Sequence, residues 1–149
     1  MIRLLPLLLL ILLILDNSAH AAVLQGQVVA VHSGDRITLK LADGTSKAIK
    51  LSGIRIPSVG KGMDRIATRH LGMLLAGRFV RVEYTSLSSS GVILGRVLHG
   101  GADIALRMLS DGLAVTEQDP RQQPSSLRRY REAEATARSR GLGFWQKLR

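Results

Sequence analysis

Hydrophobic and polar residues alternate along three segments near the start of the chain, and this pattern predicts strands. The segments span residues 23–31, 37–41 and 48–54. A period of two places successive side chains on opposite faces of a strand. The Asp-Gly pair at 43–44 predicts a tight hairpin between the second and third segments, because Asp-Gly tolerates positive φ. Pro57 ends the third strand, since proline cannot donate a hydrogen bond to a ladder.

A helical period follows the third strand. Residues 63–76 place several apolar positions on one face, and Gly77 is a typical stop. That expected face consists of Ile66, Ala67, His70, Leu71 and Leu74. Residues 79–84 and 92–98 then read as two further strands, separated by a polar loop at 86–91.

The last third of the chain predicts two more helices. Asp103 is placed to cap a short helix that runs through Ser110, because an aspartate side chain accepts free N–H groups of a first turn. Ser125 or Ser126 is expected to cap the final helix, which Gly141 ends. Five strands with helices after the third and the fifth predict an α+β fold, mainly β. We expect a five-stranded OB-fold Greek-key barrel with about three helices.

The first 21 residues read as a signal peptide. Arg3 precedes an apolar run at 4–15, which is too short for the roughly 20 residues that span a membrane, and Ala-His-Ala at 19–21 is a typical cleavage site. Residues 22–149 then form one domain, secreted or periplasmic, without a transmembrane segment after cleavage. An uncleaved membrane anchor is the alternative. No cysteine occurs in the chain.

Charge adds a class of partner to this picture. The formal net charge is +10, and residues 121–149 hold eight arginines or lysines against Glu132 and Glu134. Such an excess favours polyanions, because neutralised phosphates release their counterions. We therefore expect a monomer that binds nucleic acid or another polyanion. A basic surface that serves solubility, or attraction to anionic lipid, is the alternative.

Four stretches of the sequence share the framework of a known family. They read GQVVAVHSGDRI at 26–37, IKLSGIRIPS at 49–58, DGLA at 111–114 and GLGFW at 141–145. Together they resemble the staphylococcal-nuclease-like (thermonuclease) family over almost the whole of residues 22–149. The resemblance implies the OB-type barrel. It also implies hydrolysis of phosphodiesters in DNA and RNA with one calcium ion.

The resemblance implies calcium-binding carboxylates in two segments. In this chain only one of these two positions holds a carboxylate. Asp35 matches the calcium ligand of the first turn, where Ser33 replaces another aspartate. Arg55 stands where the family has its second calcium carboxylate. A hard cation needs oxygen ligands, and the charge of Arg55 repels it. We expect Asp35 to be a remnant metal ligand, with an Asp35–Arg55 ion pair as a hypothesis for what fills the site.

The family positions that act on phosphate and water are also substituted. Lys50 replaces an arginine, which keeps the charge and loses the planar fork. Ser58 replaces the general-base glutamate, and Val92 replaces the arginine that stabilises the transition state. Arg96 lies four residues beyond Val92, about 13 Å along a strand. It therefore cannot take that place without a change of register.

These substitutions predict a binding protein more readily than an enzyme. We expect Arg36, Lys50 and Arg55 to grip phosphate, without a cofactor, in a domain that is catalytically impaired by the family mechanism. One alternative is an active, weak nuclease that uses Ca²⁺. A second alternative is a scaffold or interaction domain of the cell envelope.

Histidines and aromatic residues add little to the predicted site. His32 adjoins the remnant site and is a candidate base, although a lone histidine is more often structural; His70 is expected to pack against the core. Base stacking needs exposed rings, and most of the aromatic residues are expected to be buried. They are Phe79, Tyr84, Tyr130, Phe144 and Trp145.

Overall fold

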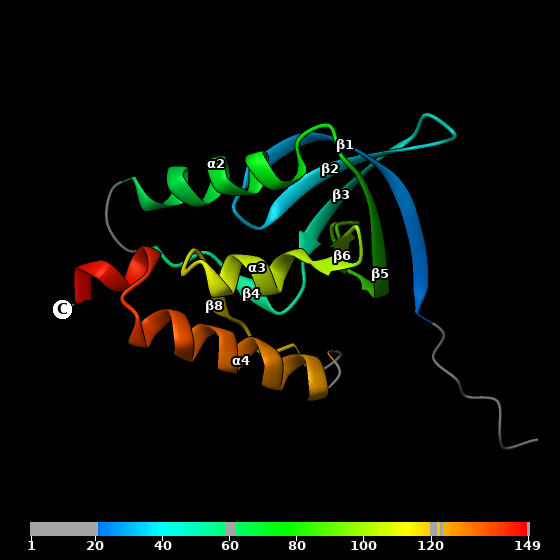
Figure 1. The fold of residues 1–149 in the computed structure, drawn as a ribbon. Helices are drawn as coiled ribbons and strands as arrows, with labels where there is room; N and C mark the ends of the chain where they lie inside the picture. The colour runs from blue at the N-terminus through cyan, green and yellow to red at the C-terminus, as the bar shows by residue number, and fades with distance from the viewer. Residues whose placement is uncertain (1–20, 59–61, 120–121, 123, 149) are drawn as a thin grey trace, which may run out of the picture.

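The computed structural model describes residues 21–58, 62–119, 122 and 124–148, and its centre is a closed β-barrel (Figure 1). The barrel strands are β1 (Ala22–Ser33), β2 (Arg36–Leu41), β3 (Ser46–Leu51), β5 (Phe79–Leu87) and β6 (Ile93–His99). Neighbouring strands pair antiparallel in the order β3-β2-β1-β5-β6, and a parallel pairing of β3 with β6 closes the ring. The predicted five-stranded barrel of the OB type is confirmed.

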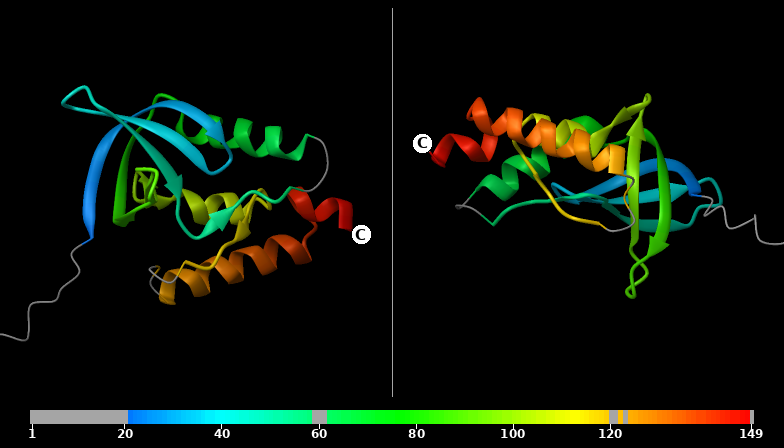
Figure 2. Two further views of the ribbon diagram at one scale, coloured as in Figure 1. Left: turned by 180° about the vertical axis from the view of Figure 1, so that it is seen from behind. Right: turned by 90° about the horizontal axis from the view of Figure 1, so that it is seen from below.

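Helices and short strands cover one side of the barrel, as both views of Figure 2 show. The helices are α2 (Met63–Leu75), α3 (Ile104–Ser110) and α4 (Pro124–Ser139), with a 3₁₀ turn η2 (Gly143–Leu148) at the end. The short strands are β4 (Ile54–Arg55), β7 (Ala102–Asp103) and β8 (Val115–Thr116), of which β4 and β8 form a two-stranded ribbon. Over the described residues, the mainly β character with three α-helices agrees with the prediction.

The core follows the alternation read from the sequence. Ile37 and Leu39 of β2 are at most 1% exposed, as are Ile49 and Leu51 of β3, while Lys40, directly after Leu39, is exposed to solvent. Burying a branched apolar side chain contributes roughly 1.5–3 kcal/mol. The period-two pattern thus fixes which face of each strand points into the barrel.

Two details of the helices differ from the prediction. The buried stripe of α2 is Met63, Ala67, Leu71 and Leu75, and Ile66 is 48% exposed, because the helix presents residues spaced by four to the barrel. The final helix begins at Pro124, so the predicted caps Ser125 and Ser126 lie inside its first turn. Proline is tolerated there because the first N–H groups of a helix have no intrahelical partner.

The aromatic residues also depart in part from expectation. Tyr130 and Phe144 are at most 2% exposed, as predicted, and Arg138 lies 4.9 Å over the ring of Trp145. Phe79, however, is 71% exposed at the start of β5. Its strand position faces outward, opposite Gln27 of β1, and the outer face of a barrel strand is solvated where no helix covers it.

Asp103 joins the barrel to two helices. Its side chain is 3% exposed and accepts the N–H of Leu106, which confirms the predicted cap. It also accepts Arg96 Nε of β6 at 2.9 Å and the Tyr130 hydroxyl of α4 at 2.9 Å. The hydrogen bond between Arg96 and Asp103 raises the pKa of Arg96. Burial raises the pKa of the Tyr130 phenol, and the negative charge of Asp103 raises it further.

The predicted signal peptide lies outside the described residues except for Ala21. Within the part of the chain that the structure describes, no helix combines the length and the apolar character needed to cross a membrane.

Tyr130→Phe should lower the free energy of unfolding by about 1 kcal/mol at neutral pH, because one hydrogen bond to Asp103 is lost. The folded-state pKa of Tyr130 lies above its unfolded value near 10. The native chain therefore loses stability as the pH rises above about 10, where the unfolded chain releases the phenol proton first. The variant lacks this part of the slope. Urea midpoints between about pH 7 and pH 11 measure both effects, with Tyr84→Phe as control. Equal alkaline slopes in all three proteins would contradict the prediction.

Candidate functional site

The turn between β1 and β2 holds the remnant acidic residue. A Cβ on Gly34 would lie 2.7 Å from the Ala67 Cβ and 2.8 Å from the Ile56 Cδ1, so only glycine fits this approach. Asp35 is 8% exposed, and its carboxylate accepts the Ser33 hydroxyl at 2.7 Å. Its carbonyl accepts the N–H of Leu51, which ties the turn to β3.

Two cations face one another beside this turn. Arg36 of β2 lies directly opposite Lys50 of β3, and Lys50 is in turn the parallel partner of Leu94 on β6. The three strands thus form one side of a hollow of about 270 Å³. Its lining consists of Arg36, Lys50, Ser88, Ser90, Val92 and Leu94.

The loop between β5 and β6 supplies the hydroxyl groups of this hollow. The Ser88 hydroxyl accepts the N–H of Val92 at 3.0 Å and lies 2.9 Å from the Ser90 hydroxyl. The Gly91 N–H donates to the Ser88 carbonyl, and the positive φ of Gly91 (78°) allows the tight turn. Figure 2 shows this hairpin reaching beyond the barrel in the right-hand view.

Lys50 has an intramolecular partner that the sequence analysis missed. Its Nζ donates to Glu117 Oε2 at 2.6 Å, with side chains 22% and 42% exposed. Glu117 follows β8, and its N–H donates to the Gly53 carbonyl just before β4. The two residues are 67 positions apart in the chain. A sequence pattern at that separation gives no signal of the contact.

The remaining predicted site residues lie outside the hollow. Arg55 is exposed on β4, and Ser58 is exposed after it. Within the described residues no ion pair joins Asp35 to Arg55; the Asp35 carboxylate accepts Ser33 instead. The structure therefore brings Arg36, Lys50 and Val92 together and leaves Arg55 and Ser58 apart from them.

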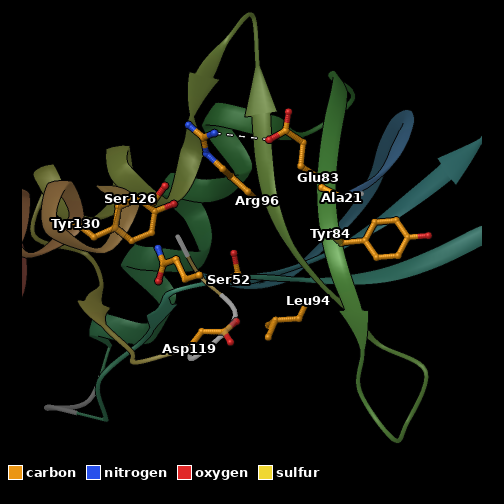
Figure 3. A pocket seen from close by; sticks show the side chains of 10 residues that line it. Ala21, Ser52, Glu83, Tyr84, Leu94, Arg96, Asp119, Ser126 and Tyr130 are labelled. Atoms are coloured by element: carbon orange, nitrogen blue, oxygen red, sulfur yellow. Dashed lines mark ion pairs between the residues drawn. The ribbon is translucent and has the colours of Figure 1, made fainter. Parts of the chain in front are cut away.

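A second hollow, shown in Figure 3, has Leu94 in its lining. Because Leu94 also lines the first hollow, the two adjoin. The cation of the second hollow is Arg96, whose guanidinium lies 3.6 Å from Glu83 and bonds to Asp103. Both neighbours are carboxylates, so the charge of Arg96 is already compensated. Arg96 thus serves the fold in this second hollow, away from Val92.

The histidines make hydrogen bonds within the fold. His32 Nε2 lies 2.7 Å from the Thr38 hydroxyl on the neighbouring strand. His70 Nε2 lies 2.7 Å from Asp111 Oδ2 at the end of α3, and this carboxylate also accepts Arg107. These contacts are consistent with structural roles that link β1 to β2 and α2 to α3.

Comparison with known families agrees with the fold. The model of the family described as staphylococcal nuclease homologue matches residues 48–147. The chain belongs to this family. The match includes Lys50, Arg55, Ser58 and Val92, whereas the turn with Asp35 precedes it. A search of curated proteins found no match.

The residues present do not fit the calcium ion that this family implies. Calcium takes six to eight oxygen ligands, mostly from carboxylates and carbonyls. Asp35 offers one carboxylate, which is already bonded to Ser33, and the position of the second carboxylate holds the cation Arg55. Across the described ranges no group of three or more histidine, cysteine, aspartate or glutamate side chains is arranged to hold a metal.

Gly34→Ala should destabilise the protein by about 1–3 kcal/mol, because the added methyl group overlaps Ala67 and Ile56 and forces the turn to shift. Gly72→Ala on α2 is the matched control. A Cβ there meets nothing within 4 Å, so this substitution should stabilise by about 0.5–1 kcal/mol. Urea unfolding measures both changes. If Gly34→Ala proved as stable as the native chain, the close packing of the turn would be refuted.

Proposed function

We propose that residues 22–149 form a secreted or periplasmic nuclease-family domain that binds nucleic acid or another polyanion and is catalytically impaired. The observation that carries the proposal is the opposition of Arg36 and Lys50 in a hollow with two serine hydroxyls. Like charges directly opposite one another destabilise a sheet. Glu117 offsets part of that repulsion by accepting a hydrogen bond from Lys50. A bound phosphate neutralises Arg36 as well, and it can accept hydrogen bonds from the cations and from one serine hydroxyl, since the other hydroxyl donates within the Ser88–Ser90 pair.

The rest of the chain supports a polyanion as the ligand. The net charge is +10, and the exposed side of α4 carries arginines that a long polyanion can reach as additional contacts. Each neutralised phosphate adds to affinity through counterion release. The exposed arginines of α4 are Arg128, Arg129, Arg131 and Arg138.

Impairment follows from the groups at the catalytic positions. Ser58 cannot act as the carboxylate base, and proton transfer by a positioned base contributes typically 10²–10⁴ in rate. Val92, on the wall of the hollow, offers no charge to a developing oxyanion. Phosphoryl chemistry depends on such electrostatic groups, so the loss of both predicts a rate far below that of an intact family member.

One observation favours a weak phosphodiesterase as a second candidate. Glu117 places a carboxylate 2.6 Å from Lys50, where it could orient water in place of the missing base. Its ion pair with Lys50 opposes this role, because the Oε2 atom already accepts a hydrogen bond from the Lys50 ammonium group instead of from a water molecule. An envelope scaffold remains the reading if neither cleavage nor binding occurs.

Purified residues 22–149 should leave single-stranded DNA and RNA intact with calcium and with chelator, and should bind both more weakly as salt rises. Gel analysis and fluorescence anisotropy on the same samples measure the two properties. Calcium-dependent cleavage that Asp35→Ala abolishes would overturn the impaired reading. If the native chain showed no salt-sensitive binding, the result would instead favour the role of an envelope scaffold.

Arg36→Gln should weaken binding of single-stranded DNA several-fold and reduce the slope of log affinity against log salt by about 0.7, since one phosphate contact is lost. Arg65→Gln removes an exposed arginine from the first turn of α2 and is the charge-matched control. Anisotropy titrations at several ionic strengths measure the slopes. Equal effects of the two substitutions would show that the hollow is not the preferred contact.

A further inference from the structure

The two cations of the hollow differ in their partners. Lys50 donates to Glu117 at 2.6 Å, and its side chain is 22% exposed. Arg36, directly across the ladder, has no carboxylate partner among the described residues. One cation is therefore engaged inside the protein while the other faces the hollow unpaired.

The backbone of the segment that carries Glu117 is hydrogen-bonded on two sides. The N–H of Glu117 donates to the Gly53 carbonyl at 2.9 Å, and Thr116 pairs with Ile54 in the β4–β8 ribbon. From the other side, Glu134 of α4 accepts the N–H of Thr116 at 2.9 Å. The carboxylate is therefore delivered to Lys50 by a segment that is anchored to both the barrel and α4.

A carboxylate and a phosphate offer the same kind of acceptor oxygen to an ammonium group. We propose that Glu117 is an internal substitute for phosphate, which holds Lys50 until a polyanion displaces it. The inference rests on the proposed function, because it concerns the regulation of the same hollow. Glu117 is 42% exposed, so its side chain has room to turn away to solvent while the backbone stays bound.

This arrangement also sets the class of ligand. A tethered carboxylate competes at an effective concentration of about millimolar, so a single small anion gains little against it. A polymer with many phosphates first binds other cations of the protein. Its next phosphate is then tethered near Lys50 and competes with Glu117 at a similar effective concentration. The pair therefore selects against isolated phosphate and in favour of extended polyanions.

Glu117→Gln removes the competing charge and keeps the shape of the side chain. The variant should bind a single-stranded oligonucleotide about 3–10-fold more tightly at low salt, from the range of partly exposed ion pairs plus one removed repulsion. The plot of its log affinity against log salt should become steeper by about 0.7, as expected for one more phosphate contact. Anisotropy with labelled oligothymidylate measures both, and inorganic phosphate serves as the competitor for isolated anions.

Two further variants test the mechanism. Asp64→Asn removes the same charge from an exposed position in the first turn of α2, where no ion pair to a cation is present among the described residues; it should change affinity less than about twofold, as expected for an exposed charge. The double variant Lys50→Gln/Glu117→Gln should lose the gain, because the released lysine is absent. Near-ultraviolet circular dichroism checks that each variant is folded.

The outcomes separate this inference from the proposed function. If the native chain binds but Glu117→Gln gives no gain, or the gain persists without Lys50, the inference is overturned and the proposed function stands. Binding that appears only in Glu117→Gln supports the inference and overturns polyanion binding by the native chain. If neither protein binds, both fail.

Discussion

The parallel pairing of β3 with β6 is the constraint on which the barrel and its candidate site depend. It joins segments more than 40 residues apart, with Ile49 opposite Ile93 and Leu51 opposite Gly95. Gly95 also lies close to β5 on its other side, because a Cβ there would lie 2.5 Å from Val82 Cγ1. The same pairing carries Lys50 alongside the β5–β6 hairpin and so creates the hollow. Closure of the core and assembly of the site are therefore one structural event.

Charge is used in two distinct ways on the strands that meet there. Arg96 is surrounded by Glu83 and the buried Asp103, which also caps α3 and binds Tyr130. Removing Arg96 would take one hydrogen-bond donor from the buried Asp103 carboxylate, which destabilises a fold, so this cation serves the structure. Arg36 has no carboxylate partner among the described residues, and the α4 arginines are exposed, although Arg128 lies 3.9 Å from Glu132 and Arg138 lies over Trp145. A basic chain can therefore use one cation to hold its fold together and still present others at its surface.

Local chemistry made much of the fold predictable, and non-local contacts limited the rest. Alternation placed Ile37 and Leu39 correctly, and the capping chemistry of Asp103 was read directly from its position before an apolar run. The start of α4 at Pro124 was missed because serine is a strong helix cap and indicated a later start, whereas proline is also favoured at the first helical position. The Lys50–Glu117 pair could not be predicted, since it depends on how the β4–β8 ribbon sits against β3.

The contrast between framework and chemistry argues for binding that is distributed over many contacts. Phosphate at the hollow finds one unpaired cation, one that Glu117 already holds, two hydroxyls and an apolar wall of Val92 and Leu94. Such a site holds a single phosphate weakly. Each charge-assisted hydrogen bond contributes only about 1.5–3 kcal/mol once the loss of hydration is included. A polymer adds contacts along the basic surface, and its affinity then grows with length and falls with salt. The residues that replace the family's catalytic groups are thus compatible with the proposed binding of extended polyanions.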